Sequence, residues 1–502
     1  MQASVEMNSM GANASRADKP RHPNVLLLFS DQHKADVLGC EGHPDAITPN
    51  LDRLAADGVR FSRAYCQDGI CLPSRCSMMS GLYPRALGCL TNGDATHVMS
   101  EVVSLQRALR QHGYRTAAFG KRHLELACDE GWEMAASHMH GESPDDNYVK
   151  WIEAQGYGEA FANDWAAEFG RGPAGGSQAK TEMPFALMAT RESQLPAGAT
   201  MEAFTAQRTV RFLEQQQHSD RPFFCWSSFY RPHQPYTPLK EYLERFPHDR
   251  WGKGVRNGDA IGKPKTLDQA VSDLPPMLQE WHRGANRVWR LDKARENPQL
   301  YRDYIAAYYA LVAEMDDHIG TILAALDRLG MAENTIVIYT SDHGDFVGSH
   351  GMIEKCAPGH NVYEDTLRVP LIVRWPGRVQ RGMVCGDLAE LVDLYPTLMA
   401  LCRCSLPASP RELQGRSLAG TLTDGLPVGR EYCISENWSQ AAIITERYKL
   451  GVWLDPQGRG PDYREWGDIL FDRQEDPLET RNRITELPEV KTCLMEHLRK
   501  WG

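Results

Sequence analysis

Short apolar runs alternate along the chain with longer segments in which apolar residues recur every three or four positions. Five runs have the apolar character of parallel strands that are buried on both faces: residues 24–30, 116–120, 222–229, 335–339 and 371–375. Four segments have helical spacing: residues 49–56, 104–112, 200–217 and 301–329. This alternation predicts an α/β fold with a doubly wound, mostly parallel sheet flanked by helices.

Local signals refine two of these helices. Thr48 is expected to cap the helix over residues 49–56, with Pro49 at its first position. Tyr304 and Tyr308 begin an apolar stripe along residues 301–329, and a stripe at this spacing is expected to lie in the core rather than bind a cofactor.

The pattern changes after about residue 405. Four short strand-like runs (residues 431–435, 441–445, 449–453 and 468–471) precede a helical segment at 490–501. We therefore expect a leader over residues 1–22, a catalytic α/β domain over 23–405 and a C-terminal α+β subdomain over 406–502. The subdomain is expected to contain an antiparallel sheet.

Composition excludes several classes of protein. The chain has 502 residues, of which 42% are hydrophobic, and a net charge of −11. A disordered chain and a small disulfide-stapled scaffold are excluded, and the acidic balance argues against a nucleic-acid partner. The 13 cysteines form no C-x-x-C pair, so no zinc ribbon is indicated. No apolar segment suits a signal peptide or a membrane span. We expect a cytoplasmic enzyme with no membrane partner, or a periplasmic one if the start is misassigned.

Polar residues follow four of the predicted strands, where ligands bind in open α/β sheets. These groups are residues 30–33, 120–123, 231–235 and 341–344. Asp31 and Asp342 are hard oxygen donors, Gln32 offers an amide oxygen and His343 a ring nitrogen. Such a set suits Ca²⁺ or Mg²⁺, and the histidine also admits Mn²⁺. A single strand-end aspartate is often only a helix cap, but convergence of four groups favours a site.

The most specific motif is Cys71-Leu72-Pro73-Ser74-Arg75. It carries the C-x-P-S-R hallmark of the type I sulfatases of the alkaline phosphatase superfamily, which this chain resembles. The Thr-Gly pair that usually follows is Ser80-Gly81 here. The resemblance extends from residue 24 to about residue 482. It includes the segments at residues 48–52, 120–123, 232–235, 342–344, 368–371, 470–472 and 476–477.

The resemblance implies a cofactor and a maturation partner. A formylglycine-generating enzyme would oxidise Cys71 to formylglycine (3-oxoalanine), whose hydrate binds a divalent metal, Ca²⁺ above all, and provides the nucleophile. The implied metal ligands are Asp31, Gln32, residue 71, Asp342 and His343.

The resemblance also assigns the remaining catalytic roles. Lys121 and Lys355 would hold the sulfate oxygens, and Arg75 would hydrogen-bond the formylglycine hydroxyl. His233 with Lys355 would protonate the leaving oxygen, and His123 would take a proton from the second hydroxyl to release sulfate.

Three departures from the common pattern leave an alternative open. Gln32 stands where many sulfatases have a second aspartate, as in the branch that resembles choline sulfatases and phosphonate monoester hydrolases. Asn92 resembles a position that contacts the ester in that branch, and His360 lies in a lengthened gap where it can line the substrate or be solvated. The alternative is thus a phosphonate monoester or phosphodiester hydrolase. The Lys121–His123 pair favours a sulfatase.

A third hypothesis is a sulfated-glycan binding protein without activity, which the intact set of site residues disfavours. The expected substrate is a small-molecule or oligosaccharide sulfate ester, with a sulfated sugar ahead of an aryl or choline ester. The sequence makes no prediction of the oligomeric state.

Overall fold

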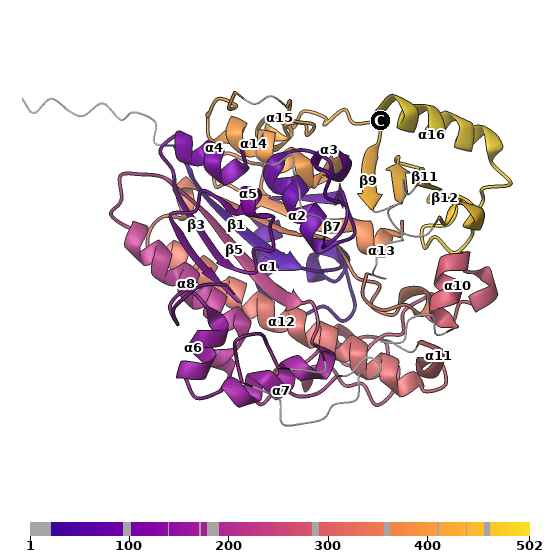
Figure 1. The fold of residues 1–502 in the computed structure, drawn as a ribbon, viewed down its shortest axis with the longest axis horizontal. Helices are drawn as coiled ribbons and strands as arrows, with labels where there is room; N and C mark the ends of the chain where they lie inside the picture. The colour runs from indigo at the N-terminus through magenta and orange to yellow at the C-terminus, as the bar shows by residue number, and fades with distance from the viewer. Residues whose placement is uncertain are drawn as a thin grey trace, which may run out of the picture.

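The computed structural model describes residues 22–93, 102–138, 140–169, 172–177, 190–283, 291–355, 362–408, 411–437, 439–455 and 462–501. Two sheets organise these residues (Figure 1). The larger has eight strands, in the spatial order β4 Met134–Ser137, β3 Arg115–Gly120, β5 Phe223–Pro232, β1 Asn24–Asp31, β6 Thr335–Ser341, β7 Arg368–Arg374, β2 Val59–Tyr65 and β8 Met383–Glu390. The predicted α/β fold with a mostly parallel sheet is confirmed.

The order of the strands places β1 at the centre of the sheet, between β5 and β6. All these pairings are parallel, whereas β7 runs antiparallel to both β6 and β2. Each of the five predicted runs overlaps a strand, with residues 222 and 375 just outside β5 and β7, but β2, β4 and β8 were not predicted. In β2 and β8, half-exposed polar residues interrupt the apolar positions, so neither strand reads as a continuous buried run.

Helices cover both faces of the large sheet (Figure 1). Leu26 and Leu28 of β1 pack with helices α1 Pro49–Ala56, α8 Met201–Gln216 and the second half of α12 Pro298–Arg328. Val25 and Leu27 point to the other face, which is covered by α2 Cys71–Ser80, α4 Leu105–Gln111 and α14 Leu394–Leu401. Burial of β1 on both faces explains its continuous apolar sequence. Among the described helices, none combines the length and apolar character needed to cross a membrane.

Shorter helices fill the connections between these elements. They are α3 Pro84–Leu87, α5 Leu126–Asp129, α6 Tyr148–Ala154, α7 Gly158–Phe169, α9 Lys240–Leu243, α10 Pro276–His282, α11 Leu291–Ala294, α13 Glu364–Leu367 and α15 Ala419–Asp424.

The predicted cap of α1 is wrong in one respect. Pro49 is the first helical residue as expected, but the Thr48 side chain makes no capping hydrogen bond. Asp316, in the middle of α12, instead accepts from the backbone amides of Asn50 and Leu51, at 3.0 and 2.8 Å. The cap therefore comes from a distant segment, and it fastens α1 to α12.

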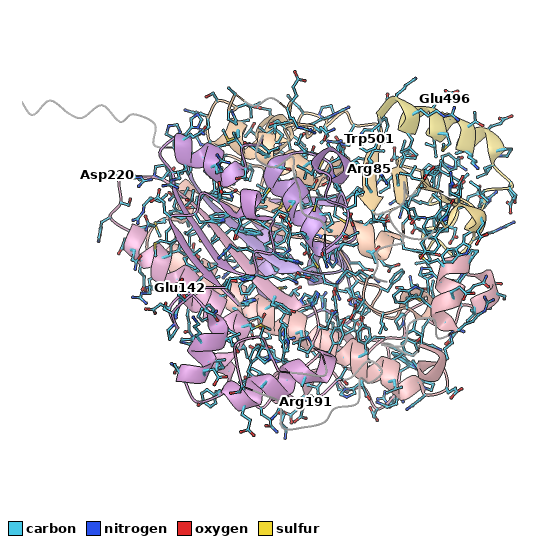
Figure 2. The ribbon with its side chains drawn as sticks, viewed as in Figure 1. Arg85, Glu142, Arg191, Asp220, Glu496 and Trp501 are labelled. Carbon is cyan, nitrogen blue, oxygen red and sulfur yellow. The ribbon has the colours of Figure 1, made fainter. Side chains whose placement is uncertain are left out.

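The second sheet is antiparallel, in the order β12 Ile469–Asp472, β11 Tyr448–Trp453, β10 Gln440–Ile444 and β9 Cys433–Asn437. Helix α16 Pro488–Trp501 covers its outer face, as the shared apolar cluster shows (Figure 1). At the end of α16, Trp501 packs edge-on against Tyr83, with ring centroids 5.1 Å apart. Figure 2 labels Trp501 and, from α3, Arg85 at this junction, where Arg85 also pairs with Glu436 of β9. The predicted antiparallel C-terminal sheet is confirmed.

Candidate active site

Two neighbouring strand ends form the floor of the site. Residues Ser30 of β1 and Ser341 of β6 are paired in register, so Asp31 and Asp342 emerge side by side. The backbone amides of Gln32 and His343 both donate to Asp342 Oδ1 at 3.0 Å. These bonds fix the carboxylate, and the carboxyl ends of the strands meet as predicted.

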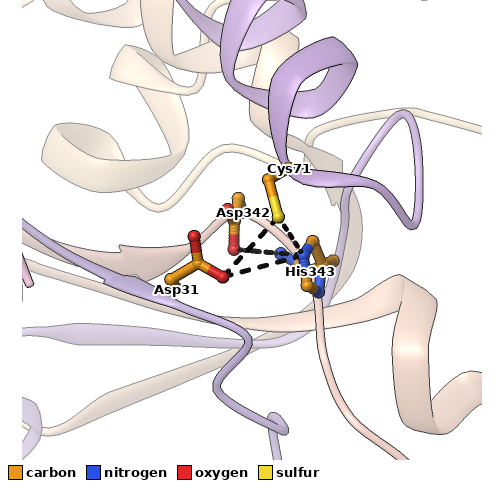
Figure 3. Close-up of side chains that lie close together, drawn as sticks. All are labelled: Asp31, Cys71, Asp342 and His343. Carbon is orange, nitrogen blue, oxygen red and sulfur yellow. Dashed lines mark hydrogen bonds and ion pairs between the residues drawn. The ribbon is translucent and has the colours of Figure 1, made fainter. Parts of the chain in front are cut away.

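Helix α2 brings Cys71 to this floor. The helix begins at Cys71 and ends at Ser80, and Gly81 follows with a φ of 71°, the left-handed conformation that favours glycine. Ser74 Oγ donates to the backbone oxygen of Asp342 at 2.6 Å, which fastens the first turn to the end of β6. Cys71 Sγ lies 3.2 Å from His343 Nε2 and 3.7 Å from Asp31 Oδ1 (Figure 3).

Arg75, one turn along α2, lies beneath the two carboxylates and is completely buried. Its Nε donates to Asp342 at 2.7 Å and its Nη2 to Asp31 at 2.9 Å. Its Nη1 donates to the backbone oxygen of Lys121 at 2.7 Å and to Ser228 Oγ at 3.1 Å. With a cysteine at residue 71, the Arg75 donors are directed to the carboxylates and to β5, and the expected hydrogen bond from Arg75 to a formylglycine hydroxyl stays a prediction.

The other predicted catalytic residues surround the same point. Lys121 Nζ lies 2.5 Å from Asp31 Oδ2, and His233 Nε2 lies 4.0 Å from Asp31 Oδ1. His123, which has a positive φ of 44°, is one of the groups that lower the pKa of Cys71. The structure thus brings residues from β1, α2 and the ends of β3 and β5 together.

Lys355 and Gln32 form one unit. Lys355 Nζ donates to Gln32 Oε1 at 2.6 Å, and Gln32 Nε2 donates to Asp345 Oδ2 at 2.7 Å. The Gln32 amide oxygen, predicted to be a metal ligand, therefore accepts from the lysine here. Asp345 was missed by the sequence reasoning, although it follows the Asp342-His343-Gly344 motif directly. Tyr304, assigned to the core stripe, donates to Asp345 at 2.7 Å.

Asn92 and His360 are the two residues predicted to contact the substrate. Asn92 Oδ1 accepts from the backbone amide of Leu72 at 3.1 Å, so it satisfies one of the first amides of α2. His360 lies outside the described residues.

The surrounding cations decide the charge of the reactive groups. Burial alone would raise the pKa of Cys71, but Lys355, Lys121 and His343 outweigh it and hold that pKa well below its usual range. Burial would likewise raise the pKa of Asp31, yet Lys121, His233 and Arg75 lower it overall. Burial, followed by Lys121 and Lys355, lowers the pKa of His233 to about 4. The surrounding charges therefore favour the anionic forms of Cys71 and Asp31 and the neutral form of His233.

The donor set fits a divalent cation. The ligand atoms of Asp31, Cys71, Asp342 and His343 all lie within 4.8 Å of one another, and the four side chains are buried (Figure 3). Two carboxylates and an imidazole are ligands that Ca²⁺, Mg²⁺ and Mn²⁺ accept. A hydroxylated side chain at residue 71 would replace a soft sulfur with a hard oxygen.

Comparison with known proteins agrees with this geometry. The model of the family described as "Sulfatase" matches residues 23–403, and "N-sulphoglucosamine sulphohydrolase, C-terminal" matches residues 348–501. The chain belongs to the sulfatase family. It is thus placed among the sulfuric ester hydrolases, as predicted.

Individual relatives cover almost the whole chain. An arylsulfatase of Clostridium perfringens is 26% identical over 95% of this chain and 93% of its own length. An N-acetylglucosamine-6-O-sulfatase of Bacteroides thetaiotaomicron is 26% identical over 93% of this chain and 83% of its own. The crystal structure of a phosphonate monoester hydrolase of Agrobacterium radiobacter has a TM-score of 0.75 at 23% identity, covering 95% of each chain.

Proposed function

We propose that this sulfatase-family chain hydrolyses sulfate monoesters of carbohydrates, with the side chain of residue 71 as the reactive group. The observation that carries the proposal is the position of Cys71. It begins α2 within 3.2 Å of His343 and 3.7 Å of Asp31, beside Lys121 and Lys355. An N-terminus of a helix and two ammonium groups favour an anion at this point.

A divalent ion held by Asp31, Asp342 and His343, most simply Ca²⁺, together with Cys71 oxidised by a formylglycine-generating enzyme, would supply an activated hydroxyl group. The protein's own residues position and neutralise the ester. Lys121 contacts Asp31 and Lys355 contacts Gln32, and the two ammonium groups can hold sulfate oxygens.

Two histidines are placed for proton transfer. His123 follows β3 and is one of the groups that lower the pKa of Cys71, so it can take a proton from residue 71. His233 lies 4.0 Å from Asp31, and its Nδ1 is held by the backbone oxygen of Gln234 at 2.8 Å. This contact leaves Nε2 facing the site, where it can act on the leaving oxygen.

We also propose that the protein is located in the cytoplasm.

A carbohydrate ester is the first choice of substrate because a relative of similar length is an N-acetylglucosamine-6-O-sulfatase. The second candidate is phosphonate monoester hydrolysis. Gln32 in place of a second aspartate favours it, as does the likeness of fold to a phosphonate monoester hydrolase. The Lys121–His123 pair favours the sulfate ester.

Kinetics on one preparation of matured enzyme separate the two. We expect kcat/KM for 4-nitrophenyl sulfate to exceed that for 4-nitrophenyl phenylphosphonate by about 100-fold or more. Lys121→Ala should lower the sulfate value more than the phosphonate value, since a sulfate monoester has one more non-bridging oxygen for the lysine to hold than a phosphonate monoester. A phosphonate preference of similar size would instead support the second candidate.

A further inference from the structure

The small C-terminal sheet turns one face toward the catalytic domain. Directly paired residues of antiparallel strands share a face, so Asn437, Gln440 and Trp453 form a row across β9, β10 and β11. Next to it lie Ser435 and Gly451, both paired with Ala442. Ala442 and Trp453 belong to the same apolar core cluster as the large sheet, which shows that this face is directed inward.

This inward face carries buried polar atoms that lack a partner. Both amide atoms of Gln440 and the hydroxyl groups of Ser435 and Ser439 have no hydrogen-bond partner among the residues that the structure describes. Each of these side chains is at most 3% exposed. Buried polar groups are almost always hydrogen-bonded, so four unsatisfied atoms at one end of a hairpin indicate a missing ligand or water.

The hairpin end borders the loop that leads into Cys71. The backbone amide of Glu436 donates to the backbone oxygen of Gln67 at 2.7 Å, four residues before Cys71. Asp68 follows Gln67 along the chain, before Cys71, and is fully buried. Its Oδ2 also has no hydrogen-bond partner among the described residues. Burial raises the pKa of Asp68 well above its usual value, and the charges of Glu436 and Cys71 act in the same direction. Asp68 thus belongs to the short loop that joins the contact with β9, at Gln67, to residue 71, and its Oδ1 accepts from the backbone amide of Ile70 at 2.8 Å.

The other border of the hairpin face is the segment that follows Lys355. A Cβ atom at Gly451 would lie 2.8 Å from Val362, so this strand and that segment are in close contact. Trp453 packs against Tyr463 and Trp466, with ring centroids 5.3 and 5.8 Å apart. Tyr463 and Trp466 are half-buried. Aromatic rings beside a few amide and hydroxyl groups are the usual lining of a small-molecule site.

We propose that the end of the β9–β10 hairpin, with Gln440, Ser435 and Ser439, together with Asp68, binds the hydroxyl groups of the sugar that carries the sulfate. This inference rests on the proposed sulfatase function. The observations that support it concern the hairpin and Asp68, and they do not depend on the roles proposed for Cys71, the lysines or the histidines. Apart from the Asp68 carboxyl oxygen, the unpartnered donors and acceptors are amide and hydroxyl groups, which suit a polyhydroxylated alcohol. The hairpin that carries the amide and hydroxyl groups borders the loop before Cys71 on one side and Val362 on the other.

The test compares sulfate esters of sugars with an aryl sulfate ester. kcat/KM is measured for 4-methylumbelliferyl sulfate and for the 6-sulfates of glucose, galactose and N-acetylglucosamine, on wild type, Gln440→Met and Ser435→Ala. Methionine keeps the length of glutamine and removes both amide partners. We expect the ratio of sugar to aryl kcat/KM to fall about 10-fold or more in Gln440→Met, because a site built to hydrogen-bond a hydroxyl group discriminates strongly.

Ile443→Val is the matched control. Ile443 lies on the outer face of the same strand, against α16. The substitution therefore loosens the small sheet without changing the inward face, and the ratio of sugar to aryl kcat/KM should stay unchanged. Equal losses on both kinds of ester in Gln440→Met would overturn the subsite. A wild type inactive on all sulfate esters would instead overturn the proposed function itself.

Discussion

At the residue scale, the site depends on one guanidinium that holds two carboxylates together. Arg75 is fully buried and donates to Asp31 and Asp342 from different nitrogens, while a third nitrogen bonds to β5 through Ser228. Two buried carboxylates this close repel each other unless a cation compensates them. Arg75 therefore positions the two carboxylates that we propose as metal ligands, in addition to its place in the C-x-P-S-R motif.

Arg75→Lys keeps the charge but cannot make these divergent contacts, since a lysine has a single donor atom. We expect the free energy of unfolding to fall by about 2–4 kcal/mol and sulfate ester hydrolysis to be lost. Urea unfolding and turnover are measured together. Arg473→Lys is the control, because Arg473 is a mostly buried partner of Glu364 away from the site. It should lose stability yet keep turnover. An active Arg75→Lys enzyme would contradict the positioning role.

At the scale of elements, α8 and α12 meet around two buried carboxyl groups. Glu202 of α8 and Glu314 of α12 share Arg231, which lies near the end of β5 and donates to the backbone oxygen of His233. Burial raises the pKa of Glu314 to about 8, and the charge of Glu202 acts in the same direction, against Arg231. At neutral pH Glu314 thus carries a proton, in a junction that supports the His233 loop.

This protonation makes stability depend on pH. A glutamate in the unfolded chain ionises near pH ~4.3, so between that pH and about 8 the folded protein holds a proton that the unfolded chain has released. The free energy of unfolding therefore falls as pH rises through this window. Glu314→Gln cannot ionise, and its advantage over wild type should grow on the order of 2–4 kcal/mol across the window.

Urea unfolding at several pH values from about 5 to about 8 checks this prediction. Glu214→Gln, on the exposed side of α8, should give the same pH profile as wild type. A constant difference between Glu314→Gln and wild type would show that Glu314 does not titrate in this range.

Helices and strands could be predicted from the sequence where their buried positions follow one regular apolar pattern. Central strands such as β1 and β6 are apolar throughout, and α12 shows an unbroken stripe, so all three were predicted. Strands β2 and β8 were missed because their partly exposed positions are polar. The cap of α1 was wrong for another reason. Asp316 is 266 residues from Asn50, and no local pattern reports such a partner.

The candidate site was predictable in composition but not in its bonding. Strand ends and the C-x-P-S-R motif identified Asp31, Cys71, Asp342 and His343, which the structure brings together. The partners of Gln32 and Arg75 depend on which donors face each other after folding. Spacing along the chain carries no such information, which is why Asp345 was missed.

At the scale of the whole molecule, the buried donor cluster links metal binding to folding. Asp31, Asp342 and His343 come from two strands and residue 71 from a helix, so an ion bound among them favours the folded chain over the unfolded one. Ca²⁺ at about 1,000 times its dissociation constant should add about 4 kcal/mol to the free energy of unfolding.

Thermal unfolding of chelator-treated protein, with and without added Ca²⁺, Mg²⁺ or Mn²⁺, measures this effect without relying on turnover. Asp342→Asn removes a carboxylate ligand and should abolish most of the shift. An equal shift in that variant would place the ion elsewhere.

The central claim is that the oxidised side chain of residue 71 carries the hydrolysis. The most direct measurement is the mass of the tryptic peptide of residues 64–75, in preparations made with and without the maturation enzyme, set against their turnover of 4-nitrophenyl sulfate. We predict an aldehyde at residue 71 and turnover proportional to the fraction converted. Full turnover by protein whose residue 71 is still a thiol would contradict the account.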